Sequence, residues 1–211
     1  MATSSPLLVN RSLPWKKSAH LALYELTIED DTPFARLYRD GDLEMPGEED
    51  VLAMEELSRT LPASHGFERY EISNYARQGF CCRHNINYWE NRPYLGLGSG
   101  AVSFLAGTRT RNVADPGRFI ELVFSGQNLQ VESEQLSKEA FFRETVIMGL
   151  RMVAGVSSDE LQLRFGISLE HYYGKVLAGL IDKGLADFFH GRLRLTNKGL
   201  LVANQVLSEL V

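Results

Sequence analysis

The sequence has little cysteine, no excess of positive charge and no long hydrophobic run. Its two cysteines, Cys81 and Cys82, are adjacent, so they form no disulfide framework and favour a reducing compartment such as the cytoplasm. The net charge of −5 argues against a nucleic-acid partner, because such proteins usually carry a basic face. No apolar stretch approaches about 18 residues, so we expect no membrane span.

What is present is typical of a globular protein of one large or two modest domains. Hydrophobic residues make up 44% of the 211 residues and charged residues 23%, which is ordinary for such proteins. The segment 1–19 has no long apolar core and no convincing cleavage site, so we interpret it as a lead-in and not as a secretory signal.

The next part of the chain predicts a strand, a helix and a second strand. Leu21–Ile28 is apolar on both faces, as in a buried parallel strand. Glu48–Leu61 has a helical apolar stripe with acids in its first turn. Arg69–Tyr75 fits a second strand. Because a helical crossover joins neighbouring parallel strands, this order predicts a parallel sheet.

The segment Tyr70–Phe104 is rich in aromatic residues and Arg, and it ends in a Gly-x-Gly-x-Gly run. Glycine allows close approach of the backbone, and aromatic rings supply broad apolar contact. This composition suits a wall that holds a flat or charged ligand. It also suits a hairpin-rich surface whose aromatic residues are half-buried, and composition alone does not separate the two.

Several motifs occur in order along this part of the chain: HLALYELTIE at 20–29, TPF at 32–34, YEISNYA at 70–76, CRHNINYW at 82–89 and YLGLGSGA at 94–101. Together they resemble the oxygen-independent coproporphyrinogen III oxidase-like family of radical-SAM proteins, and its heme-chaperone branch most closely. The resemblance covers residues 20–104 specifically and continues more loosely to the C-terminus.

The resemblance implies an α/β fold, in which residues 20–130 form the end of a radical-SAM partial (β/α) barrel. The intact family holds a [4Fe–4S] cluster with a CxxxCxxC motif and uses S-adenosylmethionine. That motif is absent from this sequence, and two adjacent cysteines leave such a cluster short of ligands. We therefore expect a C-terminal half that does not cleave S-adenosylmethionine by itself.

In the resembling branch the motif His-Asn-x-x-Tyr-Trp is associated with heme. His84, Asn85, Tyr88 and Trp89 match it in full, so the resemblance implies that these residues bind heme. Imidazole is a natural axial ligand of heme iron, which makes His84 the candidate metal ligand, held in a loop by an Asx turn of Asn85. The alternative is a structural histidine that never touches iron.

The glycine run is neither a dinucleotide-binding fingerprint nor a phosphate-binding loop, because a strand and not a helix is expected after it. The resemblance implies instead that Gly96, Gly98, Gly100 and Val102, together with Thr27, lie on the S-adenosylmethionine side of the site. Plain sheet packing is the alternative. Val102 stands where the chaperone branch usually has histidine, so any role of that histidine is absent here.

Four charged residues near these motifs are secondary candidates. Arg109 and Arg111 could bind propionate or other carboxylate groups by paired hydrogen bonds. Glu25 and Glu29 alternate along the first predicted strand and could face substrate at the barrel mouth. In both cases an ordinary surface position, or an ion pair within the chain, is the competing interpretation.

Residues 133–211 predict a separate winged-helix-like domain. The pattern indicates a helix around Phe142, a helix ending at Gly166, a helix over residues 169–183, a hairpin around His190-Gly191 and a last helix capped by Thr196. The region holds nine Lys or Arg and nine Asp or Glu. Because phosphate neutralisation dominates DNA affinity, we favour a docking or covering role over DNA binding.

The sequence thus favours a protein of heme and porphyrin metabolism. Its expected partners are heme and either a heme-acceptor protein or a chain that supplies the missing N-terminal half. Whether it acts as an enzyme is left open. The competing interpretations are a non-enzymatic docking or DNA-binding module and an inactive remnant.

Overall fold

The structure, a computed structural model, describes residues 17–211. It divides them into two compact units, which meet in the sequence between Cys81 and Cys82; they are called unit 1 and unit 2. The predicted lead-in 1–19 lies outside the described residues except for 17–19.

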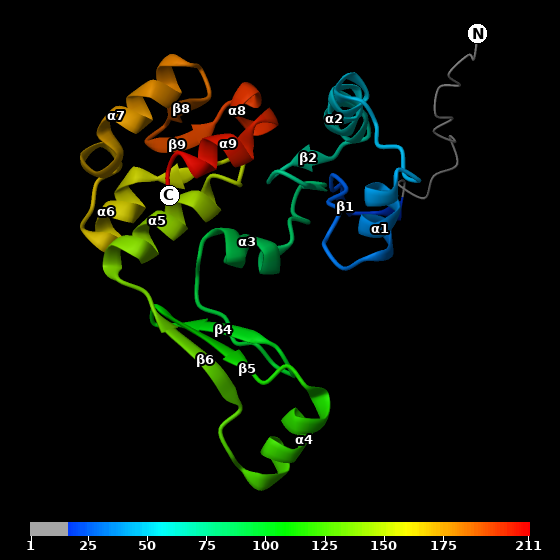
Figure 1. Cartoon of the computed structure of the whole chain (residues 1–211). Helices are drawn as coiled ribbons and strands as arrows, with labels where there is room; N and C mark the ends of the chain where they lie inside the picture. The colour runs from blue at the N-terminus through cyan, green and yellow to red at the C-terminus, as the bar shows by residue number, and fades with distance from the viewer. Residues whose placement is uncertain (1–16) are drawn as a thin grey trace. The chain divides into compact units, whose positions relative to one another are not determined.

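Unit 1 is built from short strands and two helices (Figure 1). In chain order they are β1 His20–Ala22, α1 Pro33–Asp40, α2 Glu48–Ser64, β2 Glu68–Arg69 and β3 Asn74–Ala76. The predicted helix over 48–61 is confirmed and continues to Ser64. Thr32 caps α1, with its side-chain oxygen accepting a hydrogen bond from the backbone of Ala35.

The prediction of parallel strands in unit 1 is wrong. The sheet has the order β1-β3-β2, and both pairings are antiparallel. The predicted strand 69–75 is instead a tight hairpin, in which Glu68 lies opposite Ala76. The predicted strand 21–28 ends at Ala22. The last bond between the two segments runs from the Leu23 amide to the backbone oxygen of Ser73, where the neighbouring strand β3 gives way to the hairpin turn.

The two helices of unit 1 leave large apolar side chains uncovered. On α1, Phe34 and Tyr38 are 52% and 55% exposed. On α2, Met54 and Leu57 of the predicted stripe are 41% and 54% exposed, whereas Pro62 is buried. The stripe was therefore identified correctly as helical but lies exposed within the described chain.

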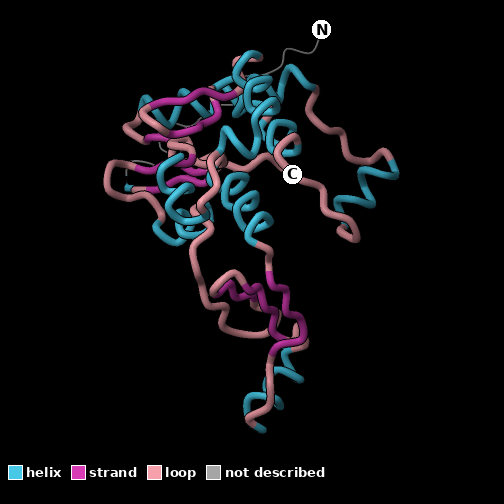
Figure 2. Tube along the Cα trace, turned by 90° about the vertical axis from the view of Figure 1, so that its left-hand side faces the viewer, coloured by secondary structure: helices cyan, strands magenta, loops and turns pink. Residues whose placement is uncertain are grey.

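Unit 2 begins with α3 Arg83–Trp89 and a sheet of three antiparallel strands in the order β4-β5-β6 (Figure 2). The strands are β4 Val102–Leu105, β5 Thr108–Asn112 and β6 Gln130–Gln135, and α4 Pro116–Ser125 connects the last two. The strand expected after the glycine run is confirmed as β4.

The rest of unit 2 is called the C-terminal module, residues 138–208. Its elements are α5 Lys138–Gly149, β7 Val156–Ser157, α6 Ser158–Phe165, α7 Leu169–Asp182, β8 Ala186–Phe189, β9 Arg192–Leu195, α8 Asn197–Leu201 and α9 Ala203–Ser208. The predicted helices and the hairpin are confirmed. The small sheet has the order β7-β9-β8 and is antiparallel.

An aromatic cluster forms the core of this module. Phe142 is fully buried on α5, and its ring lies 5.7 Å from that of Phe165 and 5.0 Å from that of Tyr172. Val146 and Leu150 continue the buried row that the sequence predicts. Among the described residues, no helix has both the length and the apolar character needed to cross a membrane.

Candidate functional site

The four residues of the His-Asn-x-x-Tyr-Trp motif lie on one short helix, α3. The expected loop with an Asx turn at Asn85 is therefore wrong, since Asn85 lies within the first turn of α3. The helix begins after Cys82, whose side chain makes no capping hydrogen bond. Helical spacing brings His84 and Tyr88 together, because residues four apart face the same side.

His84 stands at the exposed end of a row of aromatic rings. Its ring centroid lies 4.7 Å from that of Tyr88, with the planes nearly perpendicular. Tyr88 in turn lies 4.6 Å from Tyr94, and Tyr94 lies 6.3 Å from the buried ring of Phe104 on β4. The imidazole is exposed and makes no hydrogen bond within the described part of the chain. Its nitrogen atoms are thus accessible to a ligand, and Tyr88 supports the ring at its edge.

Trp89 ends α3 and is half-buried. The guanidinium of Arg151 lies 4.8 Å from the centroid of its ring, which is a cation–π contact. The indole nitrogen is buried and has no hydrogen-bond partner among the described residues. One face of the indole is therefore already occupied by Arg151, a contact that the motif alone does not reveal.

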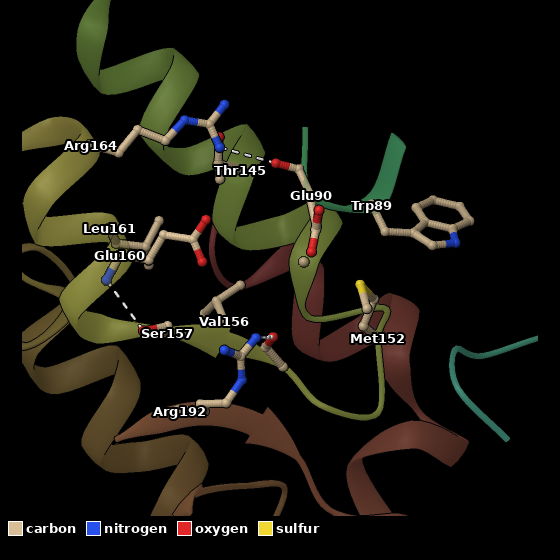
Figure 3. Close-up of a pocket in the computed structure, with 12 residues that line it drawn as sticks. Trp89, Glu90, Thr145, Met152, Val156, Ser157, Glu160, Leu161, Arg164 and Arg192 are labelled. Carbon is tan, nitrogen blue, oxygen red and sulfur yellow. Dashed lines mark hydrogen bonds between the residues drawn. The ribbon is translucent and has the colours of Figure 1, made fainter. Parts of the chain in front are cut away.

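The C-terminal end of α3 meets a pocket in the C-terminal module (Figure 3). The pocket is small, with a volume of about 40 Å³, and it is partly open to solvent; its lining includes Trp89, Met152 and Glu160. Arg164 donates hydrogen bonds to the backbone oxygens of Glu90 and Asn91. Burial lowers the pKa of Arg164 from its ordinary value.

Arg164 and Asn91 were not found from the sequence. One signal was present: Asn91 directly follows the helix and its cap, and asparagine is common in the left-handed conformation at that position. Its φ is 48° in the structure. Arg164 carried no such signal, because its partners lie more than seventy residues away in the chain.

The glycine run packs against the sheet of unit 2. A side chain at Gly96 would lie 2.2 Å from the backbone oxygen of Val102, and the Gly96 amide donates to the hydroxyl of Ser103. Gly98 and Gly100 have φ of 111° and 68°, which L-residues rarely adopt. Close packing therefore accounts for Gly96, and backbone conformation for Gly98 and Gly100, without a ligand. Their role toward S-adenosylmethionine stays a prediction.

The secondary candidates in unit 2 have partners within the chain. Arg109 on β5 lies 2.5 Å from a carboxylate oxygen of Glu144. Burial opposes the charge of Arg109, but Glu144 raises its pKa on balance. Arg111 lies 3.6 Å from Glu132 on the neighbouring strand. Both guanidinium groups thus have a carboxylate partner within the chain, and that of Arg111 is also exposed.

The secondary candidates in unit 1 are exposed. Glu25, Thr27 and Glu29 lie in the irregular segment that follows β1. Because this segment is not a strand, the two carboxylates do not line one face of a sheet as expected. Their roles toward substrate, and that of Thr27 toward S-adenosylmethionine, stay predictions.

A buried carboxylate accounts for part of the YEISNYA motif. Glu71 is fully buried at the hairpin between β2 and β3. Its Oε1 accepts hydrogen bonds from the backbone amide of Ser73 and the side-chain amide of Asn74. Its Oε2 has no partner among the described residues. Glu71 thus shapes the hairpin, a role that the sequence analysis did not assign.

The residues present fit heme better than a [4Fe–4S] cluster. Cys81 and Cys82 are both free thiols, and no group of three or more metal-binding side chains occurs among the described residues. A [4Fe–4S] cluster needs more thiolates than this chain has. An accessible imidazole is one of the side chains that ligate heme iron, and His84 with its aromatic neighbour Tyr88 fits that requirement.

Comparison with known proteins shows what the chain is similar to. Residues 136–202 match the family model of the HemN C-terminal domain. The structure resembles the radical-SAM coproporphyrinogen III oxidase HemN of Escherichia coli, with a TM-score of 0.62 over 81% of this chain and 42% of that one, at 18% identity. The fold is therefore the mixed α/β fold of the C-terminal region of a HemN-like radical-SAM protein.

Sequence relatives narrow the assignment. The chain is 34% identical to the heme chaperone HemW of Bacillus subtilis over 89% of this chain and 49% of that protein. It is 36% identical to HemW of Mycobacterium tuberculosis over 91% and 47%, and 31% identical to the mitochondrial radical S-adenosyl methionine domain-containing protein 1 of the mouse over 91% and 46%. The chain is therefore similar to the C-terminal half of the HemW heme chaperones, and it spans about half the length of the curated relatives it matches.

Proposed function

We propose that this chain carries the heme-binding part of a heme chaperone of the HemW type. The observation that carries the proposal is the position of His84, exposed on α3 with Tyr88 edge-on at 4.7 Å. Heme, when bound, supplies an iron that takes an axial imidazole, and aromatic side chains suit the faces of the macrocycle. His84 would bind the iron, and Asn85, Tyr88 and Trp89 would lie around the macrocycle.

The proposal separates heme binding from cluster chemistry. In the intact family S-adenosylmethionine and a [4Fe–4S] cluster are expected. The two adjacent cysteines of this chain do not fit the cluster, so no step is assigned to it here. Gly96, Gly98, Gly100, Val102 and Thr27 are proposed only as residues on the S-adenosylmethionine side of a complete protein. Porphyrin oxidation by this chain alone is not part of the proposal.

We propose that unit 1 packs against a polypeptide segment equivalent to the other half of the relatives. The exposed apolar side chains on α1 and α2 support this proposal. Apolar groups gathered on a surface usually mark an interaction site. Residues 20–130 would then complete a partial (β/α) barrel with that polypeptide.

We propose that residues 133–211 form a winged-helix-like domain that docks onto a partner or covers the substrate, and that it does not bind DNA. The helices α5 to α7 followed by the β8–β9 hairpin support this arrangement. The only Lys or Arg residues on or directly after α7 are Lys175 and Lys183, which is little for phosphate contacts. Heme transfer to an acceptor protein in the cytoplasm is the expected role of the whole protein, although one relative is named as mitochondrial.

Hemin titration tests the proposal. We expect saturable binding with a shifted Soret band. Trp89→Ala should weaken binding through lost apolar contact and leave the position of the band unchanged, because tryptophan does not ligate iron. Linear, non-saturating absorbance changes would contradict the proposal and favour the docking-module or remnant interpretations.

A further inference from the structure

We propose that the C-terminal module positions the heme-binding helix through a clamp made of Arg164, Asn91 and Thr145. The inference rests on the proposed function, because it concerns how His84 is held for its ligand. Arg164, Asn91 and Thr145 are positioning residues here, since none of them is proposed to contact heme.

The first part of the clamp is a pair of hydrogen bonds from Arg164. Its two terminal nitrogens lie 3.0 Å from the backbone oxygen of Glu90 and 2.6 Å from that of Asn91 (Figure 3 shows the first of these bonds). The last carbonyls of a helix have no partner within it, so they need donors from elsewhere. A cation at this end also interacts favourably with the helix dipole. Arg164 on α6 thus supplies hydrogen-bond donors to the C-terminal end of α3.

Arg164 is itself held in place by the aromatic core of the module. Its guanidinium lies 4.9 Å from the ring centroid of Phe141 and 5.0 Å from that of Phe165. A planar guanidinium can stack on rings with its face and donate two hydrogen bonds from its edge, whereas an ammonium group has no flat face to stack. The end of α3 is therefore tied to a rigid part of the module.

The second part of the clamp comes from α5. The side-chain amide of Asn91 donates to the hydroxyl of Thr145 at 3.2 Å, and that hydroxyl donates to the backbone oxygen of Phe141. Asn91 and Thr145 are 4% and 5% exposed. Buried polar groups are costly to leave unpaired, so this bond resists opening. Together with the contact of Arg151 on Trp89, it fixes α3 from its C-terminal end.

At the opposite end of α3, no side-chain hydrogen bond among the described residues holds the helix. Cys82 makes no capping bond, and within the described part of the chain the His84 imidazole makes no hydrogen bond and has a ring contact only with Tyr88. A rigid helix transmits the position of its fixed end to its free end. The place of the His84 imidazole in unit 2 is therefore set by the clamp together with the packing of Tyr88 on Tyr94, and loosening the clamp should weaken heme binding without removing the ligand.

The test uses the full chain with Arg164→Lys and the matched control Arg118→Lys. Arg118 is an exposed arginine on α4, paired with Glu121 and placed in neither site. We expect amide hydrogen exchange in residues 86–91 to become roughly tenfold faster in Arg164→Lys, from loss of one or two charge-assisted hydrogen bonds. Hemin affinity should fall by roughly the same factor. The control should change neither.

A double-mutant cycle separates positioning from general destabilisation. If Arg164 acts through His84, then Arg164→Lys should cause no further loss of affinity once His84 is replaced by alanine, whereas independent effects would add. Asn91→Gly is the second variant, because glycine keeps the positive φ while removing the side-chain bond. It should reproduce the faster exchange in α3 and lower the thermal midpoint, because it removes a buried hydrogen bond.

Each outcome bears on one of the two proposals. Unchanged exchange in residues 86–91 of Arg164→Lys overturns the clamp, whatever hemin does. Faster exchange with unchanged or fully additive hemin affinity overturns the positioning role and leaves the proposed function standing. Failure of the unmodified chain to bind hemin overturns the proposed function and the positioning role, and faster exchange would then show only a structural contact.

Discussion

Unit 1 and the C-terminal module bury their apolar side chains to very different extents. The module encloses Phe142, Val146 and Leu150 almost completely. In unit 1, by contrast, Phe34 and Leu57 remain about half exposed although they lie on well-formed helices. The module contains its own core, and helices there have partners close in the sequence. Unit 1 has a sheet of two- and three-residue strands, which offers its helices little to pack on.

Truncating one core residue in each region should give the largest contrast. We expect Phe142→Ala to lower the free energy of unfolding by about 3–5 kcal/mol, because it empties a fully buried site among aromatic rings. Leu57→Ala should cost less than about 1 kcal/mol, since the side chain is 54% exposed. Urea unfolding of both variants measures this. Equal costs would mean that Leu57 is covered in solution.

Two glycines sharpen the same comparison. Gly155 and Gly41 have φ of 63° and 80°, but a side chain at Gly155 would lie 2.0 Å from the backbone oxygen of Leu193, whereas Gly41 has open space. Gly155→Ala should therefore cost about 3 kcal/mol, from strain plus overpacking, and Gly41→Ala only about 1 kcal/mol. Thermal unfolding of both variants should rank them in this order. The reverse order would contradict the packing of β7 on β9.

The exposed apolar side chains on the helices of unit 1 should contribute to binding a partner. The N-terminal half of the Bacillus subtilis HemW protein supplies the part that this chain does not match, and we expect it to bind by titration calorimetry. Leu57→Lys should weaken the complex roughly tenfold by placing a charge in an apolar contact. Leu163→Lys is the matched control, since Leu163 is 90% exposed on α6. Equal affinity of both variants would exclude α2 from the interface.

Tyr173 gives the smallest expected effect, and it is specific to the module. Burial raises the pKa of its phenol above the ordinary value of 10.0, and the hydroxyl donates to the backbone oxygen of Leu210. The neutral form is favoured in the folded state, so this stabilisation is complete below about pH 10 and is lost as the pH rises above it. Tyr173→Phe should cost about 1 kcal/mol at neutral pH and flatten the decline above pH 10. Parallel pH profiles of both proteins would contradict this.

The contrast between the regions also explains what the sequence could predict. Helices of the module follow local signals, such as the caps at Ser137, Ser157 and Thr196 and the glycine at 166. The strand prediction for 21–28 failed because strand pairing depends on residues far along the chain. The same alternation of apolar residues suits a buried strand and an exposed segment.

The candidate site shows the same division. The motif residues His84, Tyr88 and Trp89 were found from their order in the sequence, but α3 was mistaken for a loop because it is short and begins without a polar cap. Arg164 could not be predicted, since its contact with α3 spans more than seventy residues. Sequence patterns identify side chains that could bind a ligand, and only the fold shows which other residues hold those side chains in place.

The position of the Soret band in two histidine variants tests the central claim most directly. His84→Ala removes the proposed iron ligand, and His171→Ala removes another exposed histidine, on α7, that has no proposed role. With hemin bound, we predict that His84→Ala shifts the band and weakens binding, while His171→Ala matches the unmodified chain. If His84→Ala leaves both band position and affinity unchanged, His84 is not the ligand and the heme-binding account of α3 is wrong.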